Sequence, residues 1–217
     1  MPPTRGVGNL GWTPNIIAPT SIVQQAIAVT ETINTTGATL LVAMLSANGT
    51  PGTISDSFSN TWQYLPSVGD IGGGGATNVR FGYVYGPTVG SSHAFTVGIG
   101  YSAILFAFSN TLTNAAVFDS SNGGSPLASM PFQPGSVSPA LGDVVVTGFA
   151  SNASLNPSAV ISIDSGFATP TTTDSTVTAA ASYLLGANGS AVNPNWNVTI
   201  YGDVGASGVI ACFRSAG

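Results

Sequence analysis

The amino-acid sequence predicts an all-β protein, specifically a two-layer antiparallel β-sandwich with an internal pseudo-two-fold repeat and an extended N-terminal arm. Short runs rich in β-branched and aromatic residues are bounded by Gly, Pro, Asn and Ser, as strands usually are. No segment sustains a helical period with charged faces. A similar order of strand, turn and closing strand occurs twice, over about residues 38–110 and 143–215. Two copies are too few for a solenoid, so one sandwich is expected.

Residues 1–20 are expected to form an irregular, extended arm rather than a strand or a helix, because they carry four prolines among Gly and Asn. An arm at a terminus needs something to hold it. Trp12, Ile16 and Ile17 are the expected anchors, either onto the chain's own sandwich or onto a neighbouring subunit. Residues 21–217 are then expected to form a single domain, since that length is ordinary for one sandwich.

Eleven segments have the composition of strands. They are residues 21–31, 38–47, 60–65, 78–85, 93–99, 102–109, 143–151, 158–163, 176–185, 196–201 and 207–213. Hairpin spacing without a βαβ rhythm favours antiparallel sheets. Residues 104–108 and 144–146 are apolar at every position, so both faces of these strands should be covered. They are expected to be central strands, or to lie beneath the arm or another subunit.

Asp56 and Asp164 occupy matching places in the two repeats, and each is followed by Ser. Both are interpreted as structural turn residues that accept hydrogen bonds from nearby backbone N–H groups, with Asn60 in the first turn. A glycosidase pair would have to face across one cleft, whereas the repeat places these two carboxylates in separate copies. Asp56, Asn60 and Asp70 together offer oxygen ligands for Ca²⁺, but no Asp-x-Asp-x-Asp spacing accompanies them, so no metal is expected.

The chain carries very little charge. Only 5% of its 217 residues are charged, the cations are three arginines, and the net charge is −5. Such a chain lacks the basic stripe that neutralises phosphates, so a nucleic-acid partner is not expected. No apolar run approaches the roughly 20 residues of a membrane-spanning helix, so membrane insertion is not expected either. Few charges leave little electrostatic protection against self-association, which favours other copies of the chain as partners.

The sequence predicts no catalytic residue and no cofactor. His93 is the sole histidine, and no Gly-x-Ser-x-Gly elbow accompanies it, so it is interpreted as a turn or strand-edge residue with a satisfied ring. Cys212 lies in an apolar run, where burial should raise the pKa of its thiol and leave it inert. Trp62, Tyr64, Tyr83 and Tyr85 would form a platform for a sugar ring if they shared an exposed face, although aromatic residues of a sandwich more often pack in its core.

One stretch carries a resemblance to known proteins. Residues 54–62 read Ile-Ser-Asp-Ser-Phe-Ser-Asn-Thr-Trp; an apolar run precedes them, and residues 81–85 (Phe-Gly-Tyr-Val-Tyr) follow. This pattern resembles a loosely defined class of β-sandwich modules with a D-S-x-x-N-x-W/Y turn, which occur in bacteriophage virion proteins and bacterial surface proteins. Residues 208–213 are similar to the closing strand of that class. The resemblance implies a jelly-roll-like fold and a structural or adhesive role.

The expected function is that of a non-enzymatic structural protein of a virus particle, such as a phage capsid decoration protein or a tail or fibre component that self-associates on the virion. Its partners would be other copies of itself and other virion proteins. The N-terminal sequence lacks a basic segment followed by an apolar one, which fits assembly in the host cytoplasm. The alternative is a carbohydrate-binding or adhesive module at an extracellular bacterial surface, with a surface glycan as its partner.

Overall fold

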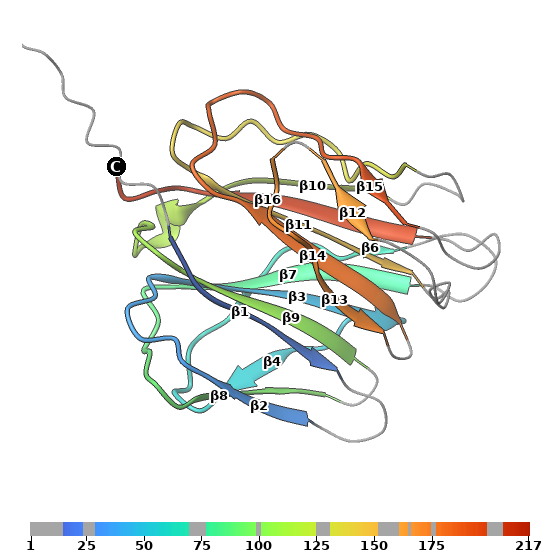
Figure 1. Cartoon of the computed structure of the whole chain (residues 1–217). Coiled ribbons are helices and arrows are strands. Elements are labelled where there is room, and N and C mark those ends of the chain that lie inside the picture. The colour runs from blue at the N-terminus through green and yellow to red at the C-terminus, as the bar shows by residue number, and fades with distance from the viewer. Residues whose placement is uncertain are drawn as a thin grey trace, which may run out of the picture.

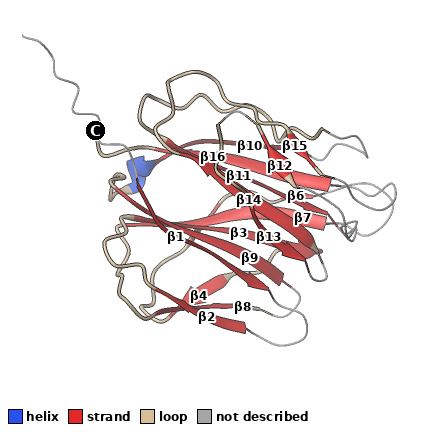
Figure 2. Ribbon diagram, viewed as in Figure 1, coloured by secondary structure: helices blue, strands red, loops and turns tan. Residues whose placement is uncertain are grey.

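A computed structural model of the chain describes residues 15–23, 29–69, 77–98, 101–124, 131–151, 161–164, 166–174, 177–198 and 206–217, with only the backbone described for residues 15–23, 29 and 174. The protein is all-β, as predicted. Its strands form four sheets that lie as successive layers (Figure 1). Apart from one short 3₁₀ turn, η1 (Ala115–Val117), the described elements are strands (Figure 2).

The first inner sheet has the strand order β1–β9–β3–β7–β5, and β6 also pairs with β7. Its strands are β1 (Asn15–Val23), β3 (Leu40–Asn48), β5 (Gln63–Tyr64), β6 (Val68–Gly69), β7 (Thr77–Tyr85) and β9 (Tyr101–Ser109). All its pairings are antiparallel.

The second inner sheet has the order β10–β16–β11–β14–β13 and is also antiparallel throughout. Its strands are β10 (Phe118–Gly124), β11 (Val144–Ser151), β13 (Thr171–Asp174), β14 (Thr178–Leu184) and β16 (Ala206–Phe213). When the strands of each inner sheet are ranked along the chain, leaving β6 aside, both sheets read first, fifth, second, fourth, third. The strand orders thus correspond, while the pseudo-two-fold repeat of the two halves stays a prediction.

Two small outer sheets cover the far faces of the inner ones. β2 (Val29–Ile33), β8 (His93–Val97) and β4 (Ile54–Asp56) form one, with β8 in the middle. β12 (Ser162–Ile163) and β15 (Trp196–Asn197) form the other. The predicted sandwich is therefore present, but it is flanked by additional layers that the two-layer expectation did not include.

The inner strands are buried on both faces because side chains alternate between two apolar clusters. In β3, Leu40, Val42 and Met44 enter the cluster between the inner sheets, whereas Leu41, Ala43 and Leu45 enter the cluster beneath the β2–β8–β4 sheet. β9 alternates in the same way between these two clusters. Residues 104–108 and 144–146 accordingly lie in central strands, as expected. The β2–β8–β4 sheet covers the outer face of β9, and the segments that contain Val137 and Val192 cover Val145.

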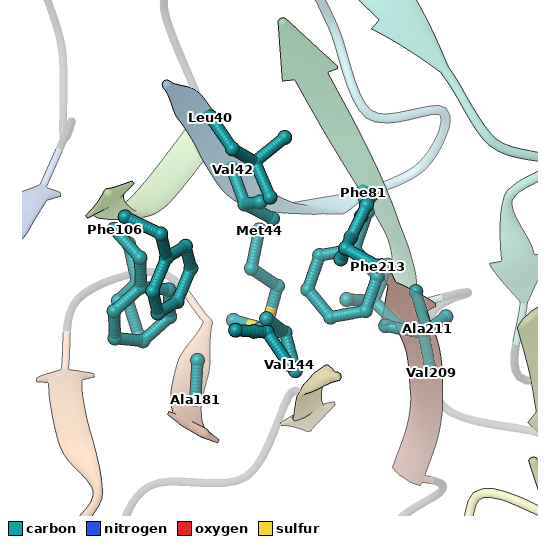
Figure 3. Packing of buried hydrophobic residues seen from close by; sticks show 14 of the residues in the cluster. Leu40, Val42, Met44, Phe81, Phe106, Val144, Ala181, Val209, Ala211 and Phe213 are labelled. Atoms are coloured by element: carbon teal, nitrogen blue, oxygen red, sulfur yellow. The ribbon is translucent and has the colours of Figure 1, made fainter. Parts of the chain in front are cut away.

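The interface between the inner sheets is closely packed (Figure 3). Met44 extends from β3 toward β11, where Val144 lies in the same cluster. A Cβ atom on Gly148 of β11 would come within 2.0 Å of the Met44 Sδ atom. Gly148 therefore leaves the space that Met44 fills. A hydrogen bond of 2.7 Å from the Ser207 hydroxyl to the Thr77 carbonyl oxygen also joins the two sheets.

The N-terminal segment differs from its predicted form. Residues 15–20 do not form an irregular arm but belong to β1, which pairs with β9 from Asn15–Ser109 to Val23–Ser102. The register shifts between Ile16 and Ala18, so Ile17 sits at a bulge. Pro19 is accommodated because β1 is an edge strand, which does not require every N–H to donate. Trp12 lies outside the described residues.

Candidate functional site

A cluster of hydrogen-bonded polar side chains centres on Asp56, at the end of β4. The Asp56 Oδ1 atom accepts hydrogen bonds from the backbone N–H of Phe58 (3.0 Å) and from Asn60, through its backbone N–H (3.3 Å) and its side-chain amide (3.1 Å). Oδ2 accepts one of 2.8 Å from the Trp62 indole N–H. The chain turns here with Ser59 in the left-handed region, at φ 55°, and the Ser59 N–H donates to the Asp56 carbonyl oxygen.

Asn60 extends this turn to the loop that follows β7. Its side-chain amide donates to the Thr88 carbonyl oxygen (3.0 Å), and its side-chain oxygen accepts from the Thr88 N–H (2.8 Å). The oxygen atoms of Asp56 and Asn60 are thus already used by N–H donors. Asp70, the third residue considered as a Ca²⁺ ligand, lies outside the described residues. Within the described ranges, no group of three or more His, Cys, Asp or Glu side chains could hold a metal ion.

His93, in β8, connects Asp56 to Thr35. Its Nε2 atom lies 3.1 Å from Asp56 Oδ1, a close contact without ideal hydrogen-bond geometry. Its Nδ1 atom lies 2.9 Å from the Thr35 hydroxyl. Because an ionised carboxylate can only accept, we assign the ring hydrogen to Nε2, so that Nδ1 accepts from Thr35. The Thr35 hydroxyl also accepts from the Gly90 N–H, at 3.2 Å.

This Asp–His–Thr row has the composition of a catalytic triad but not its accessibility. Thr35 and His93 are both fully buried. Phe95 stacks on the imidazole at a centroid distance of 4.1 Å, and Phe58 packs against it edge-on at 4.6 Å. A nucleophile must reach its substrate, and the Thr35 hydroxyl has no such path. The arrangement instead fastens the loop before β3, the turn after β4 and β8 to one another.

Asp56 remains ionised in this setting. Burial by itself would raise the pKa of its carboxyl group, but the hydrogen bond from Trp62, the contact with His93 and the backbone N–H groups of Asn60 and Phe58 together lower the pKa below the ordinary 3.8. The carboxylate charge is therefore part of what holds the turn.

Asp164, just after β12, also begins a turn, in which the Phe167 N–H donates to the Asp164 carbonyl oxygen at 3.4 Å. Its carboxylate accepts from Asn195, through the backbone N–H at 2.7 Å and through the side-chain amide. Each aspartate therefore begins a turn of its own. The Asp56 carboxylate bonds mainly within that turn, whereas the Asp164 carboxylate bonds to Asn195, in the segment before β15.

The structure does not bring the four candidate sugar-stacking residues together. Trp62 and Tyr64 pack against the cluster beneath the β2–β8–β4 sheet, while Tyr83 and Tyr85 pack against the cluster between the inner sheets. Tyr83 stacks on Phe118 at a centroid distance of 5.8 Å. The pairs thus belong to opposite faces of the first inner sheet, and no single platform contains them.

Cys212 is fully buried in β16, and its thiol lies 3.5 Å from the Asp143 carboxylate. Burial, followed by the negative charge of Asp143, raises the pKa of the thiol far above its ordinary value. The carboxylate of Asp143 accepts backbone N–H bonds from Ala140 (2.8 Å) and Ser215 (3.1 Å). This pair therefore serves the fold and does not supply a nucleophile.

Sequence reasoning missed the partnership of Asp56, His93 and Thr35. Each residue carried a local signal at most, and nothing in the sequence pairs residue 93 with residues 35 and 56. The signal that comes nearest is the Asp-Ser-x-x-Asn-x-Trp spacing, which places the carboxylate, the amide and the indole in one turn.

Comparisons with known proteins add little to this geometry. No protein-family model matches the chain, and no curated protein matches it. One solved structure, "Crystal structure of PBSX exported protein XepA", matches over 95% of this chain and 88% of that one, with 8% sequence identity and a TM-score of 0.24. Among the described residues, no helix has the length and apolar character needed to cross a membrane.

Proposed function

We propose that this chain is a non-enzymatic structural protein of a virus particle, such as a bacteriophage capsid decoration protein or a tail or fibre component. It would act by associating with copies of itself and with other virion proteins. This assembly would take place in the host cytoplasm. The observation that carries the proposal is the scarcity of charge: 3 cationic and 8 acidic side chains in 217 residues. Charge normally keeps soluble proteins apart.

The location of the described charges adds to this argument, because several are used within the chain. Asp56 binds its own turn, Asp143 binds two backbone N–H groups, and Arg214 pairs with Asp119. A surface composed largely of Ser, Thr, Asn and Gly is then left for contacts with neighbours. Depletion of charge is also what distinguishes the central part of protein–protein interfaces.

The polar clusters support a structural role as well. In the Asp–His–Thr row, Thr35 and His93 are fully buried, and Phe58 and Phe95 pack against the imidazole. Cys212 is also buried, with a raised thiol pKa. Both groups stabilise the fold by fastening loops and strands. A thick, closely packed sandwich suits a component that has to persist in a particle.

The first test is the mass of the purified protein in solution, measured by light scattering after size-exclusion chromatography. We expect an oligomer. Deleting residues 1–14 should weaken assembly and leave the β-sheet circular dichroism unchanged. The deletion must stop before Asn15, because β1 begins there and belongs to the first inner sheet. Replacing residues 1–14 by a Gly/Ser sequence of equal length is the matched control for chain length.

A wild-type protein that stays monomeric at every concentration would contradict self-association. The virion assignment has its own test, in which phage particles are purified from cells that carry the gene and their proteins are identified by mass spectrometry. We expect the chain among the particle proteins. Its absence from such particles would overturn the virion assignment even if the protein forms oligomers.

A further inference from the structure

An open groove of about 440 Å³ lies at the ends of β4 and β8, beside the first residue of β9. Its lining consists mainly of glycines and side chains that carry hydroxyl groups: Gly52, Thr53, Ser55, Thr96, Gly98 and Tyr101. The described residues that line it include no charged side chain. Its volume falls in the range of about 300–1,000 Å³ that is usual for sites of small organic ligands.

The register of the outer sheet builds one wall of this groove. β4 and β8 pair Ile54 with Val97 and Ser55 with Thr96. Ile54 and Val97 are buried in the cluster beneath the sheet. Because successive side chains of a strand point to opposite faces, Ser55 and Thr96 point away from that cluster. Two hydroxyl groups therefore stand side by side on this wall.

Tyr101 supplies an aromatic surface whose position depends on two glycines. A Cβ atom on Gly52 would come within 2.3 Å of the Tyr101 Cε2 atom, and one on Gly98 within 2.7 Å. The ring therefore rests against backbone at both places. Arg80 holds the neighbouring loop, since its guanidinium donates to the Gly52 carbonyl oxygen and lies 4.3 Å from the centroid of the Tyr64 ring.

The hydrogen-bonding groups of the groove are mostly free to meet a ligand. The Thr96 hydroxyl bonds to that of Thr30 at 2.7 Å. The hydroxyl groups of Thr53, Ser55 and Tyr101 have no hydrogen-bond partner among the described residues. Three free hydroxyls beside an aromatic ring match a molecule that combines many hydroxyl groups with apolar C–H surfaces. The lack of charge in the lining disfavours an ionic ligand, which would lose its hydration without gaining a counter-charge.

We propose that this groove binds a neutral saccharide, with Tyr101 contacting the C–H face of a sugar ring and Thr53, Ser55 and Thr96 bonding its hydroxyl groups. The site differs from the aromatic platform considered from the sequence. The indole N–H of Trp62 is already bonded to Asp56, and Tyr83 and Tyr85 lie on the other face of the inner sheet. The proposal is independent of the virion assignment.

The test is saturation-transfer NMR on the full chain with a panel of neutral sugars: glucose, galactose, N-acetylglucosamine, and the disaccharides cellobiose, lactose and chitobiose. Glucuronic acid serves as the charged comparison. We expect at least one neutral sugar to bind, with a Kd of about 1 mM or below, the affinity of a weak small-ligand site. Ser55→Trp should abolish that binding by filling the groove. Thr32→Trp, which adds the same bulk at an exposed position of the same outer sheet, should leave it unchanged.

Tyr101→Phe keeps the ring and removes one free hydroxyl, so it should weaken binding several-fold without disturbing the fold. This variant keeps the test decisive if Ser55→Trp fails to fold, which circular dichroism would reveal. Binding of no neutral sugar in the panel would overturn the proposal. Binding that survives both variants would also overturn it. So would the opposite pattern, in which Trp62→Phe loses binding and Ser55→Trp keeps it.

Discussion

Replacing Asp56 by Ala should lower the free energy of unfolding, because the carboxylate holds several hydrogen bonds of the turn after β4. The substitution removes the acceptor of the Trp62 indole N–H, of the Asn60 amide and of two backbone N–H groups, together with the contact to His93. A hydrogen bond to a charged group contributes about 1.5–3 kcal/mol. The Phe58 N–H is exposed and regains water, so the inward contacts to Trp62 and His93 dominate the loss.

The loss of these two inward contacts gives an expected cost of about 3 kcal/mol in the free energy of unfolding. For a chain of this size, that corresponds to a fall in Tm of roughly 6–12 °C. Differential scanning calorimetry measures the Tm, and denaturant unfolding followed by circular dichroism measures the free energy. Glu31→Gln is the control, because Glu31 is an exposed carboxylate on the same outer sheet and should change stability by less than about 0.5 kcal/mol.

The reasoning would be refuted if Asp56→Ala unfolded at the same temperature as the wild-type protein. Loss of sugar or Ca²⁺ binding at an unchanged Tm would show in addition that the carboxylate serves a ligand and not the turn. A Tm lowered as far by Glu31→Gln as by Asp56→Ala would show that general charge, and not the turn, carries the effect.

The folded protein lowers the pKa of Asp56. The ionised carboxylate therefore contributes its full share to the free energy of unfolding above about pH 4, and this share is lost as the pH falls through the folded pKa. Asp56→Asn should accordingly lose less stability than the wild type during acid titration monitored by circular dichroism. Gly148→Ala, whose Cβ would meet Met44, should cost about 1–3 kcal/mol in urea unfolding. The loss of stability caused by Gly148→Ala should be smaller in a Met44→Ala protein than in the wild type. An equal loss in the two proteins would contradict the contact between residue 148 and Met44. Cys212 should not react with Ellman's reagent in the native protein and should react once unfolded; rapid native labelling would contradict its burial.

The inner strands could be predicted from the sequence because their apolar runs have no other stable location. Predicted segments 38–47, 102–109 and 207–213 correspond closely to β3, β9 and β16. The strands that were missed lie at sheet edges. β10 reads Phe-Asp-Ser-Ser-Asn-Gly-Gly, a composition typical of turns, and becomes a strand because β16 offers it an unpaired edge. β13 reads Thr-Thr-Thr-Asp and forms in the same way against β14.

The candidate site was predictable only in its local part. Asp56 and Asn60 could be assigned to one turn because the donors lie within a few residues of the carboxylate. The contact of Asp56 with His93 spans 37 residues of sequence, and it exists because β4 and β8 pair. Neither apolar periodicity nor turn composition specifies such a pairing of short outer strands, and the same holds for the groove beside Tyr101.

The division of the chain between the inner sheets has a consequence for synthesis on the ribosome. The first inner sheet uses residues 15–109, and the second uses residues 118–213. The first inner sheet can therefore form while the second is still being translated. Its apolar face, which includes Leu40, Met44 and Phe106, then remains exposed to water. Exposed apolar faces of this kind attract chaperones or other nascent chains. We expect a fragment that stops near residue 110 to pair with its own copies, because its bare face would otherwise remain in water.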